Sequence, residues 1–188
     1  VPLSQNNHQA LGRVDYSVSD NTKLFFRYNF QAEVQPFPVG LWWRNPNQVP
    51  YPTSVVADNR SHSTTTSLTK VFGATLTSET TFGLTYINFP NRLEDPTKVS
   101  RSALGFDNPG IYKNGLDQIP SIVTWGDGPT MFNPGGFDPE LFAKKWLVSI
   151  AQNVTKVAGA HTIKGGGYYE WVNNNQPGNG DSNGRLES

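Results

Sequence analysis

The residues in this chain most able to bind a transition metal are its three histidines, because cysteine is absent. Transition-metal sites need several Cys, His or carboxylate ligands at short, regular spacings. His8, His62 and His161 stand far apart, and His161 lies beside an expected turn. We therefore predict no metal site, and the lack of cysteine also excludes disulfides and thiolate nucleophiles.

Four aspartates lie in a segment rich in Gly, Asn and Pro, where carboxylates could bind calcium. Asp107, Asp117, Asp127 and Asp138 are spread along this segment, whereas an EF-hand gathers its ligands at alternate positions of one short loop. Turn formation explains these aspartates without a cation.

Covalent catalysis has no support in the sequence. A serine nucleophile of the hydrolase type would lie in a G-x-S-x-G turn, and this motif does not occur. Gly165, Gly166 and Gly167 lie inside a strand pattern, where glycine permits close approach, and not in a phosphate-binding loop. We predict no catalytic residue and no cofactor, and we expect the chain not to be an enzyme.

Aromatic side chains in two long connections are the candidate ligand-binding residues. Trp42, Trp43 and Arg44 lie in a Pro-rich connection, and Trp125 and Phe132 lie in a second one. Aromatic rings on loops can stack on sugars or hold apolar ligands. Alternatively, they pack the loops against one another or against further strands. We take these five residues as the candidate site for an unknown ligand.

The composition favours strands as the elements that position these loops. Only 36% of the residues are hydrophobic, 12% are aromatic, and Gly and Pro are plentiful, a mixture typical of all-β proteins with many turns. Fifteen basic residues balance fifteen acidic ones, so we expect no binding of nucleic acid. No stretch approaches the roughly 20 apolar residues of a transmembrane helix, which barrel strands do not need.

Residues 9–33 show the clearest period of two. Apolar residues fall on one parity and polar residues on the other, with Leu11 and Phe25 as exceptions. Residues 19–22 (SDNT) supply turn chemistry between the two halves. The pattern predicts a long β-hairpin with one apolar and one polar face.

Two further hairpins are predicted over residues 61–89 and 145–172, with breaks near residues 73–75 and 156–160. Strands of roughly 9–11 residues suit a bilayer, whereas soluble strands are usually about 5–6 residues long. The predicted fold is all-β, an antiparallel transmembrane β-barrel segment of about six long strands in three hairpins.

Long and short connections alternate, with the long ones at about residues 34–60, 90–144 and 173–188. Outer-membrane barrels have short periplasmic turns and longer extracellular loops, so we expect an outer-membrane location in a Gram-negative-type bacterium. Lys70 would share a parity with apolar residues, near enough to the periplasmic end to snorkel. Aromatic residues flank the long connections like a membrane girdle: Tyr28, Phe30, Tyr86, Phe89, Tyr169 and Trp171.

Six strands are too few to close a membrane barrel, which needs about 8. Unpaired strand edges are also unfavourable in lipid. Residues 1–188 are therefore expected to be part of a larger barrel, with outer-membrane lipid and the remaining strands as partners. We identify no plug domain within these residues.

Two segments resemble Oar-like TonB-dependent receptors, large outer-membrane proteins that often carry a carboxypeptidase-regulatory-like domain. Residues 11–16 (LGRVDY) and 19–28 (SDNTKLFFRY) are similar to a barrel hairpin of that family, and residues 159–168 (GAHTIKGGGY) resemble a G-x-H-x-[hydrophobic]-K-x-G strand entry. The resemblance implies a barrel of about 22 strands around a plug. It also implies uptake of a siderophore, glycan, peptide or similar nutrient, powered by the TonB complex through an N-terminal part not seen here.

Two alternatives remain at this stage. One is another outer-membrane barrel, such as a porin or an adhesin. The other is a soluble, secreted, carbohydrate-binding β-sandwich, which predicts a second sheet packed over the apolar strand faces.

Overall fold

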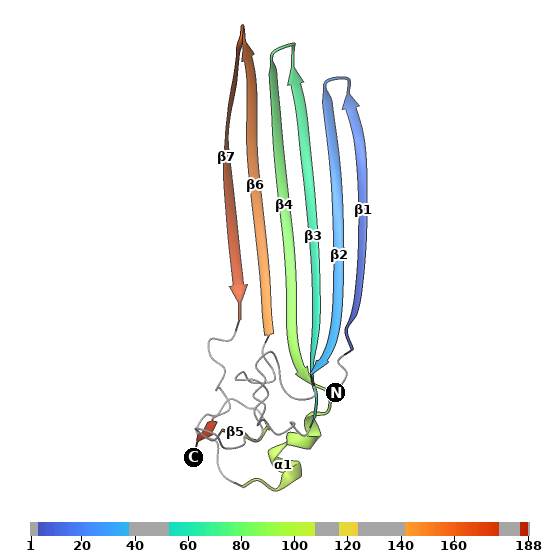
Figure 1. Ribbon diagram of the computed structural model, residues 1–188, viewed down its shortest axis with the longest axis vertical. Coiled ribbons are helices and arrows are strands. Elements are labelled where there is room, and N and C mark those ends of the chain that lie inside the picture. The colour runs from blue at the N-terminus through green and yellow to red at the C-terminus, as the bar shows by residue number, and fades with distance from the viewer. Residues whose placement is uncertain (1–3, 38–52, 108–116, 124–141, 177–184, 188) are drawn as a thin grey trace.

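The protein is dominated by one long antiparallel sheet, with a small folded segment at one end (Figure 1). The computed structural model describes residues 4–37, 53–107, 117–123, 142–176 and 185–187. The sheet order is β1-β2-β3-β4-β6-β7. Its strands are β1 (Asn6–Ser19), β2 (Thr22–Phe37), β3 (Val55–Phe72), β4 (Leu76–Leu93), β6 (Phe142–Ala158) and β7 (His161–Asn175).

The prediction of an all-β barrel segment with six long strands in three hairpins is confirmed. The strands extend further than the sequence pattern indicated: β3 begins at Val55, not near residue 61, and β4 ends at Leu93, not near residue 89. Val55, Val56 and Ala57 are consecutive apolar residues. Alternation is therefore lost where the strands continue, so a period of two could not detect this part.

The hairpin turns are short and lie together at one end of the sheet (Figure 1). Asp20 and Asn21 make the first turn. Gly73 and Gly159 in the second and third turns have φ angles of 65° and 60°. L side chains rarely adopt this left-handed conformation, so glycine suits both positions.

Each hairpin projects beyond the previous one by two residues. Thr22, at the first turn, pairs with Lys70, and β3 continues to Phe72. Leu76, at the second turn, pairs with Lys156, and β6 continues to Ala158. The offset is about one residue per strand. A sheet that closes into a barrel has tilted strands and needs such a stagger.

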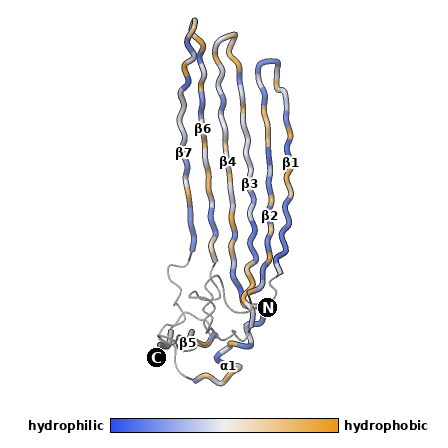
Figure 2. Tube along the Cα trace, in the orientation of Figure 1, coloured by the Kyte–Doolittle hydropathy of each residue, from blue (hydrophilic) through white to orange (hydrophobic). Residues whose placement is uncertain are grey.

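The register sorts the side chains into two faces, and hydropathy alternates along the strands accordingly (Figure 2). Even-numbered residues of β1, β2, β3, β4 and β6 share one face with odd-numbered residues of β7. We call this the apolar face. Its exposed residues include Val14, Phe26, Leu68, Phe82, Ile150, Ile163 and Trp171.

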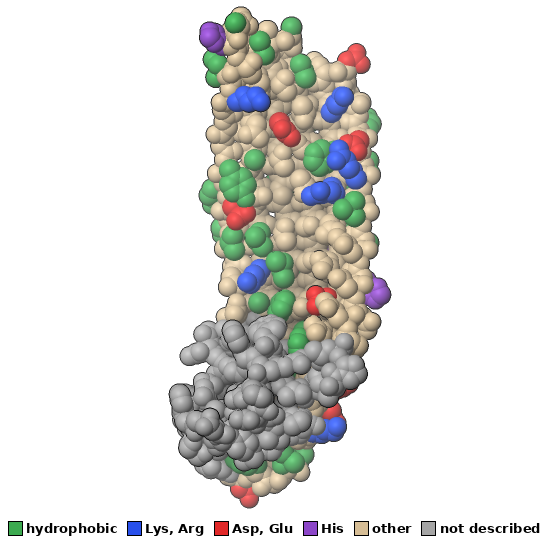
Figure 3. Space-filling model, in the orientation of Figure 1, with side chains coloured by type: hydrophobic (Ala, Val, Ile, Leu, Met, Phe, Trp, Pro, Cys, Tyr) green, Lys and Arg blue, Asp and Glu red, His purple; other side chains and the backbone are tan. Residues whose placement is uncertain are grey.

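The opposite face is the polar face. Figure 3 shows a face of the sheet on which acidic and basic side chains are scattered among uncharged ones, as the register places them on the polar face. On the polar face, the guanidinium carbon of Arg13 lies 4.6 Å from the ring centroid of Phe25. This contact explains one of the two exceptions to the sequence pattern.

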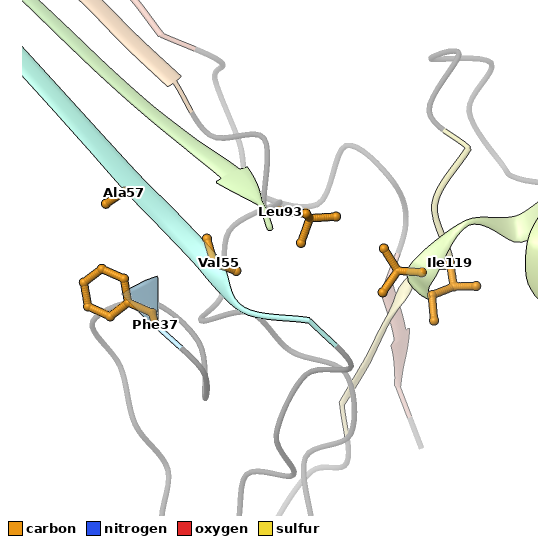
Figure 4. Packing of buried hydrophobic residues seen from close by; sticks show 6 residues of the cluster. Phe37, Val55, Ala57, Leu93 and Ile119 are labelled. Atoms are coloured by element: carbon orange, nitrogen blue, oxygen red, sulfur yellow. The ribbon is translucent and has the colours of Figure 1, made fainter. Parts of the chain in front are cut away.

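The folded segment packs at the end of the sheet opposite the turns. It contains the 3₁₀-helix η1 (Pro96–Val99), the short helix α1 (Arg101–Leu104) and β5 (Ser121–Val123), which pairs in parallel with β8 (Arg185–Glu187). Its buried apolar residues pack against strand ends (Figure 4). We call these residues the rim cluster: Phe37, Val55, Ala57, Leu93, Val99 and Ile119.

The described residues place no second sheet over the apolar face. The only other sheet among them is the two-stranded one at the rim. The sandwich alternative required a packed partner for the apolar strand faces, and the described chain leaves large side chains there exposed.

Candidate functional site

Four basic residues bracket the apolar face. Lys70 and Lys156 lie near the turns, while Arg60 and Lys144 lie toward the rim. Lys70 shares its face with Leu68 and Phe72, as the sequence suggested. No charged residue of β3 or β6 lies on this face between the brackets.

The distance between the basic residues at the two ends of the apolar face matches the thickness of a membrane. Arg60 and Lys70 are ten positions apart on β3, and Lys144 and Lys156 are twelve apart on β6. At about 3.3 Å per residue, these intervals span about 33–40 Å along the strands. A barrel tilt of about 40° reduces the thickness to about 25–30 Å, close to the apolar band of an outer-membrane barrel.

Gln152, inside this band, is hydrogen bonded to polar side chains of the neighbouring strand β4. The Thr80 hydroxyl donates to Gln152 Oε1 at 2.6 Å, and Gln152 Nε2 donates to Ser78 Oγ at 2.8 Å. Both amide atoms of Gln152 are thus satisfied across β4 and β6. In an apolar medium an unpaired amide would be strongly unfavourable, so this pairing makes Gln152 compatible with the band.

An aromatic row crosses the apolar face one step inside Arg60 and Lys144. Phe30, His62, Tyr86 and Trp146 are successive cross-strand partners. The centroids of Tyr86 and Trp146 are 4.4 Å apart, and those of Phe30 and His62 are 5.0 Å apart. His62 Nδ1 also lies 2.7 Å from the Tyr28 hydroxyl. Rings with polar groups are typical of a membrane interface. Phe89, which we expected in this girdle, pairs with Ala143 on the polar face.

The polar face carries hydroxyls and charges held in local hydrogen bonds. Ser67 donates to Glu79 Oε1 at 3.1 Å, and Thr81 donates to Ser67 Oγ at 3.2 Å. Arg13 donates through Nε and Nη2 to both carboxylate oxygens of Asp15, at 2.8 and 2.7 Å. This face can therefore offer a hydrated or protein partner many donors and acceptors.

Two shallow hollows lie on the polar face. One, of about 250 Å³, is lined near the turns by residues that include Arg13, Asp15 and Phe25. The other, of about 220 Å³, lies nearer the rim and is lined by residues that include Gln31, Glu33 and Phe89. Sequence alternation assigned Arg13 to the polar face but could not show which residues of different strands share a hollow.

Asp117 organises the rim segment. Its Oδ2 accepts hydrogen bonds from the hydroxyls of Ser100 at 2.5 Å and Ser102 at 2.6 Å, and its Oδ1 accepts from the Ser102 amide at 3.1 Å. These donors, led by Ser100, lower the pKa of the Asp117 carboxyl to about 2. The local sequence assigned Asp117 to a turn, and its spacing could not identify these partners.

Similar capping occurs at η1. Asp95 Oδ1 accepts from the hydroxyl of Thr97 at 2.6 Å and from its amide at 3.1 Å. The Thr97 hydroxyl is the main cause of a lowered pKa for Asp95. A carboxylate at a helix start satisfies amides that have no partner within the helix, so Asp95 fixes where η1 begins.

The predicted ligand-binding residues Trp42, Trp43, Arg44, Trp125 and Phe132 lie outside the described residues. Their role stays a prediction. Among the residues that are described, no group of His, Asp and Glu is arranged to hold a metal ion. No helix in the described ranges is long and apolar enough to cross a membrane.

A family model described as an outer membrane beta barrel domain matches residues 1–187. The chain belongs to this family. Members of the outer membrane β-barrel family reside in the outer membrane of Gram-negative bacteria, which confirms the predicted location. The match supports an outer-membrane β-barrel protein and not the Oar-like receptor group specifically. No curated protein and no solved structure shows significant similarity to the chain.

Membership of this family explains the apolar band between the four basic residues. An outer membrane β-barrel needs an apolar belt of membrane thickness on one face of its wall. The apolar face supplies this belt and the polar face is the other side of the same wall.

Proposed function

We propose that this chain forms part of the barrel wall of an Oar-like TonB-dependent receptor that takes up a large nutrient, such as a siderophore, glycan or peptide. The role is transport and not catalysis. The resemblance of residues 11–28 and 159–168 to barrel hairpins of that group supports this proposal, together with the character of the polar face.

The mixed charge of the polar face is the observation that carries the proposal. Basic and acidic side chains occur there in nearly equal number, whereas charge-selective pores are lined by rings of one sign. A mixed, hydrogen-bonding wall suits contact with a folded plug and a large polar solute. The charged strand residues of this face are Arg13, Asp15, Lys23, Arg27, Glu33, Glu79, Lys145, Lys164 and Glu170.

The proposal assigns a partner to each surface of the sheet. Outer-membrane lipid covers the apolar face, and a plug contacts the polar face. Further barrel strands pair with the outer edges of β1 and β7, because unpaired backbone groups in lipid are unfavourable by several kcal/mol each. The TonB complex acts through a part of the receptor outside these residues.

Growth of the source bacterium on single nutrients tests the uptake role. Deleting the gene should abolish growth on at least one siderophore, supplied as the sole source of iron, or on one glycan or peptide, supplied as the sole source of carbon or nitrogen. Dissipating the proton-motive force across the inner membrane should stop uptake of that nutrient as completely as the gene deletion does.

A porin gives a different result, because diffusion through an open pore needs no energy. Uptake that depends on the gene but continues after de-energisation would replace the receptor with a porin. Unchanged growth on every nutrient, with loss of surface attachment, would favour the adhesin alternative.

A further inference from the structure

Two basic residues lie in one cross-strand row of the apolar face, just outside the aromatic row. Arg60 of β3 pairs with Asn88 of β4, and Asn88 pairs with Lys144 of β6. Neighbouring strands are about 4.8 Å apart, so the two basic residues are about 10 Å apart at the backbone. Long Arg and Lys side chains at this separation can reach one common anion.

The positive charge of this row is incompletely neutralised. Lys144 is exposed and has no hydrogen bond or ion pair with any described residue. Arg60 Nε donates to Asp58 Oδ1 at 3.2 Å, and its Nη2 donates to Oδ2 at 3.4 Å. Asp58 is the only acidic residue on the apolar face of the described strands, and exposed Arg92 adds a further positive charge beyond the row.

The basic residues at the turn end are engaged differently. Lys156 Nζ donates to the Thr75 hydroxyl at 2.8 Å, and Lys70 Nζ lies 5.0 Å from the ring centroid of Phe72. They also occupy different rows, because Lys70 pairs with Ser78 while Lys156 pairs with Leu76. The arrangement of Arg60 and Lys144 in one row is therefore particular to the rim end.

The surface on the membrane side of this row suits acyl chains. Tyr86 and Trp146 lie next to Asn88 and Lys144 along their strands, and Phe82 and Ile150 continue the apolar face beyond them. An anion at Arg60 and Lys144 would thus sit directly above an apolar surface. A lipid with a phosphate in its headgroup combines these two features, and a soluble anion has only the first.

We propose that Arg60 and Lys144 bind the phosphate of an outer-membrane lipid headgroup, while its acyl chains lie along Trp146, Tyr86 and Ile150. The inference rests on the proposed contact of the apolar face with lipid and not on the uptake role. The bound lipid would belong to the membrane leaflet nearest the rim.

Lipid titration followed by native mass spectrometry tests the site, with the protein in a non-ionic detergent. The probes are phosphatidic acid and diacylglycerol with the same acyl chains, and inorganic phosphate as a competitor. The variants are Arg60→Gln and Lys144→Gln. Matched controls are Arg27→Gln and Lys145→Gln, which remove the same charges from the polar face. Circular dichroism verifies the β-structure of each variant.

We expect phosphatidic acid to bind more tightly than diacylglycerol. Each apolar-face variant should weaken phosphatidic acid binding about fivefold, since one basic residue near a lipid surface contributes about that factor. Both controls should bind as the wild type does, and inorganic phosphate at the same concentration should not displace the lipid.

Four results would overturn the proposal. Equal affinity for the two lipids would remove the phosphate site but leave the lipid contact intact. Equal weakening by the polar-face controls would show only a general charge effect, and displacement by inorganic phosphate would show a soluble-anion site. Binding of neither lipid would also contradict the proposed lipid contact itself, while the uptake role would still rest on the growth experiment.

Discussion

On β6, Ile150 and Ala151 are neighbours in sequence but belong to opposite faces of the sheet. Ile150 opposes Phe82 and Tyr169, whereas Ala151 opposes Thr81 and Tyr168. The apolar face thus exposes hydrocarbon side chains, whereas the polar face exposes side chains with hydrogen-bonding groups. The local surroundings of a position in this wall therefore depend on its parity more than on its place along the strand.

The largest expected difference between the two faces comes from placing one charge on each face at the same depth. Ile150→Lys should lower the free energy of unfolding in a bilayer by about 2–4 kcal/mol, because the charge enters the middle of the apolar band. Ala151→Lys should have a much smaller effect. Urea titration of the protein in vesicles, followed by tryptophan fluorescence, measures both. Equal losses would mean that the faces do not meet different solvents.

A second pair tests the faces by shape instead of charge. A Cβ on Gly166, on the polar face, would collide with the Gln152 carbonyl and lie 2.6 Å from Asn153 Oδ1, whereas nothing lies within 4 Å of a Cβ on Gly167. Gly166→Ala should lower the free energy of unfolding by about 1–3 kcal/mol. Gly167→Ala should be neutral or slightly stabilising. The same titration compares them, and a tolerated Gly166→Ala would contradict the close packing of β6 on β7.

The aromatic row offers a smaller test. Tyr28→Phe removes the hydroxyl that lies 2.7 Å from His62 Nδ1 while keeping the ring. The expected loss in unfolding free energy is about 0.5–1.5 kcal/mol. Tyr169→Phe is the matched control, since Tyr169 lies on the same face in β7. An equal loss in both variants would show that the Tyr28–His62 contact has no particular role.

The smallest expected effect separates the rim from the wall. The pKa of Asp117 is lowered, so its contribution is present above its unfolded pKa, near 3.8, and is lost as the pH falls through about 2. Hydrogen exchange of the Ser102 amide should accelerate over this interval relative to the Asp117→Asn variant, while amides within β3 stay protected. A carboxyl titration by NMR with a midpoint near 3.8 would contradict the arrangement around Asp117.

The sequence predicted the wall well, because a period of two depends only on which residues face lipid. Five of the six strands follow from alternation and turn residues, whereas residues 63–72, which include Lys70, alternate poorly. It did not predict the rim, where Val55 to Ala57 are apolar on both parities and where Asp117 meets Ser100 from 17 positions away. Such contacts depend on tertiary placement, which no local pattern encodes.

Phe25 and Phe89 show a second limit of prediction from the spacing along one strand. Both are aromatic residues on the polar face, where alternation alone expects polar side chains. Phe25 lies there beneath a guanidinium. Because cross-strand partners are not encoded in the spacing along one strand, the neighbours of these rings required the register.

The interval between the basic brackets has a consequence for the choice of membrane. The bracketed length fits a bilayer of one hydrocarbon thickness, and hydrophobic mismatch in either direction would force the strands to change slope or the lipids to stretch or compress. A bilayer with long acyl chains would pull Lys70 and Arg60 toward hydrocarbon, whereas a thin one would leave both in water. The spacing of these basic residues therefore makes the fit of the wall depend on bilayer thickness. It is suited to thin membranes such as the bacterial outer membrane.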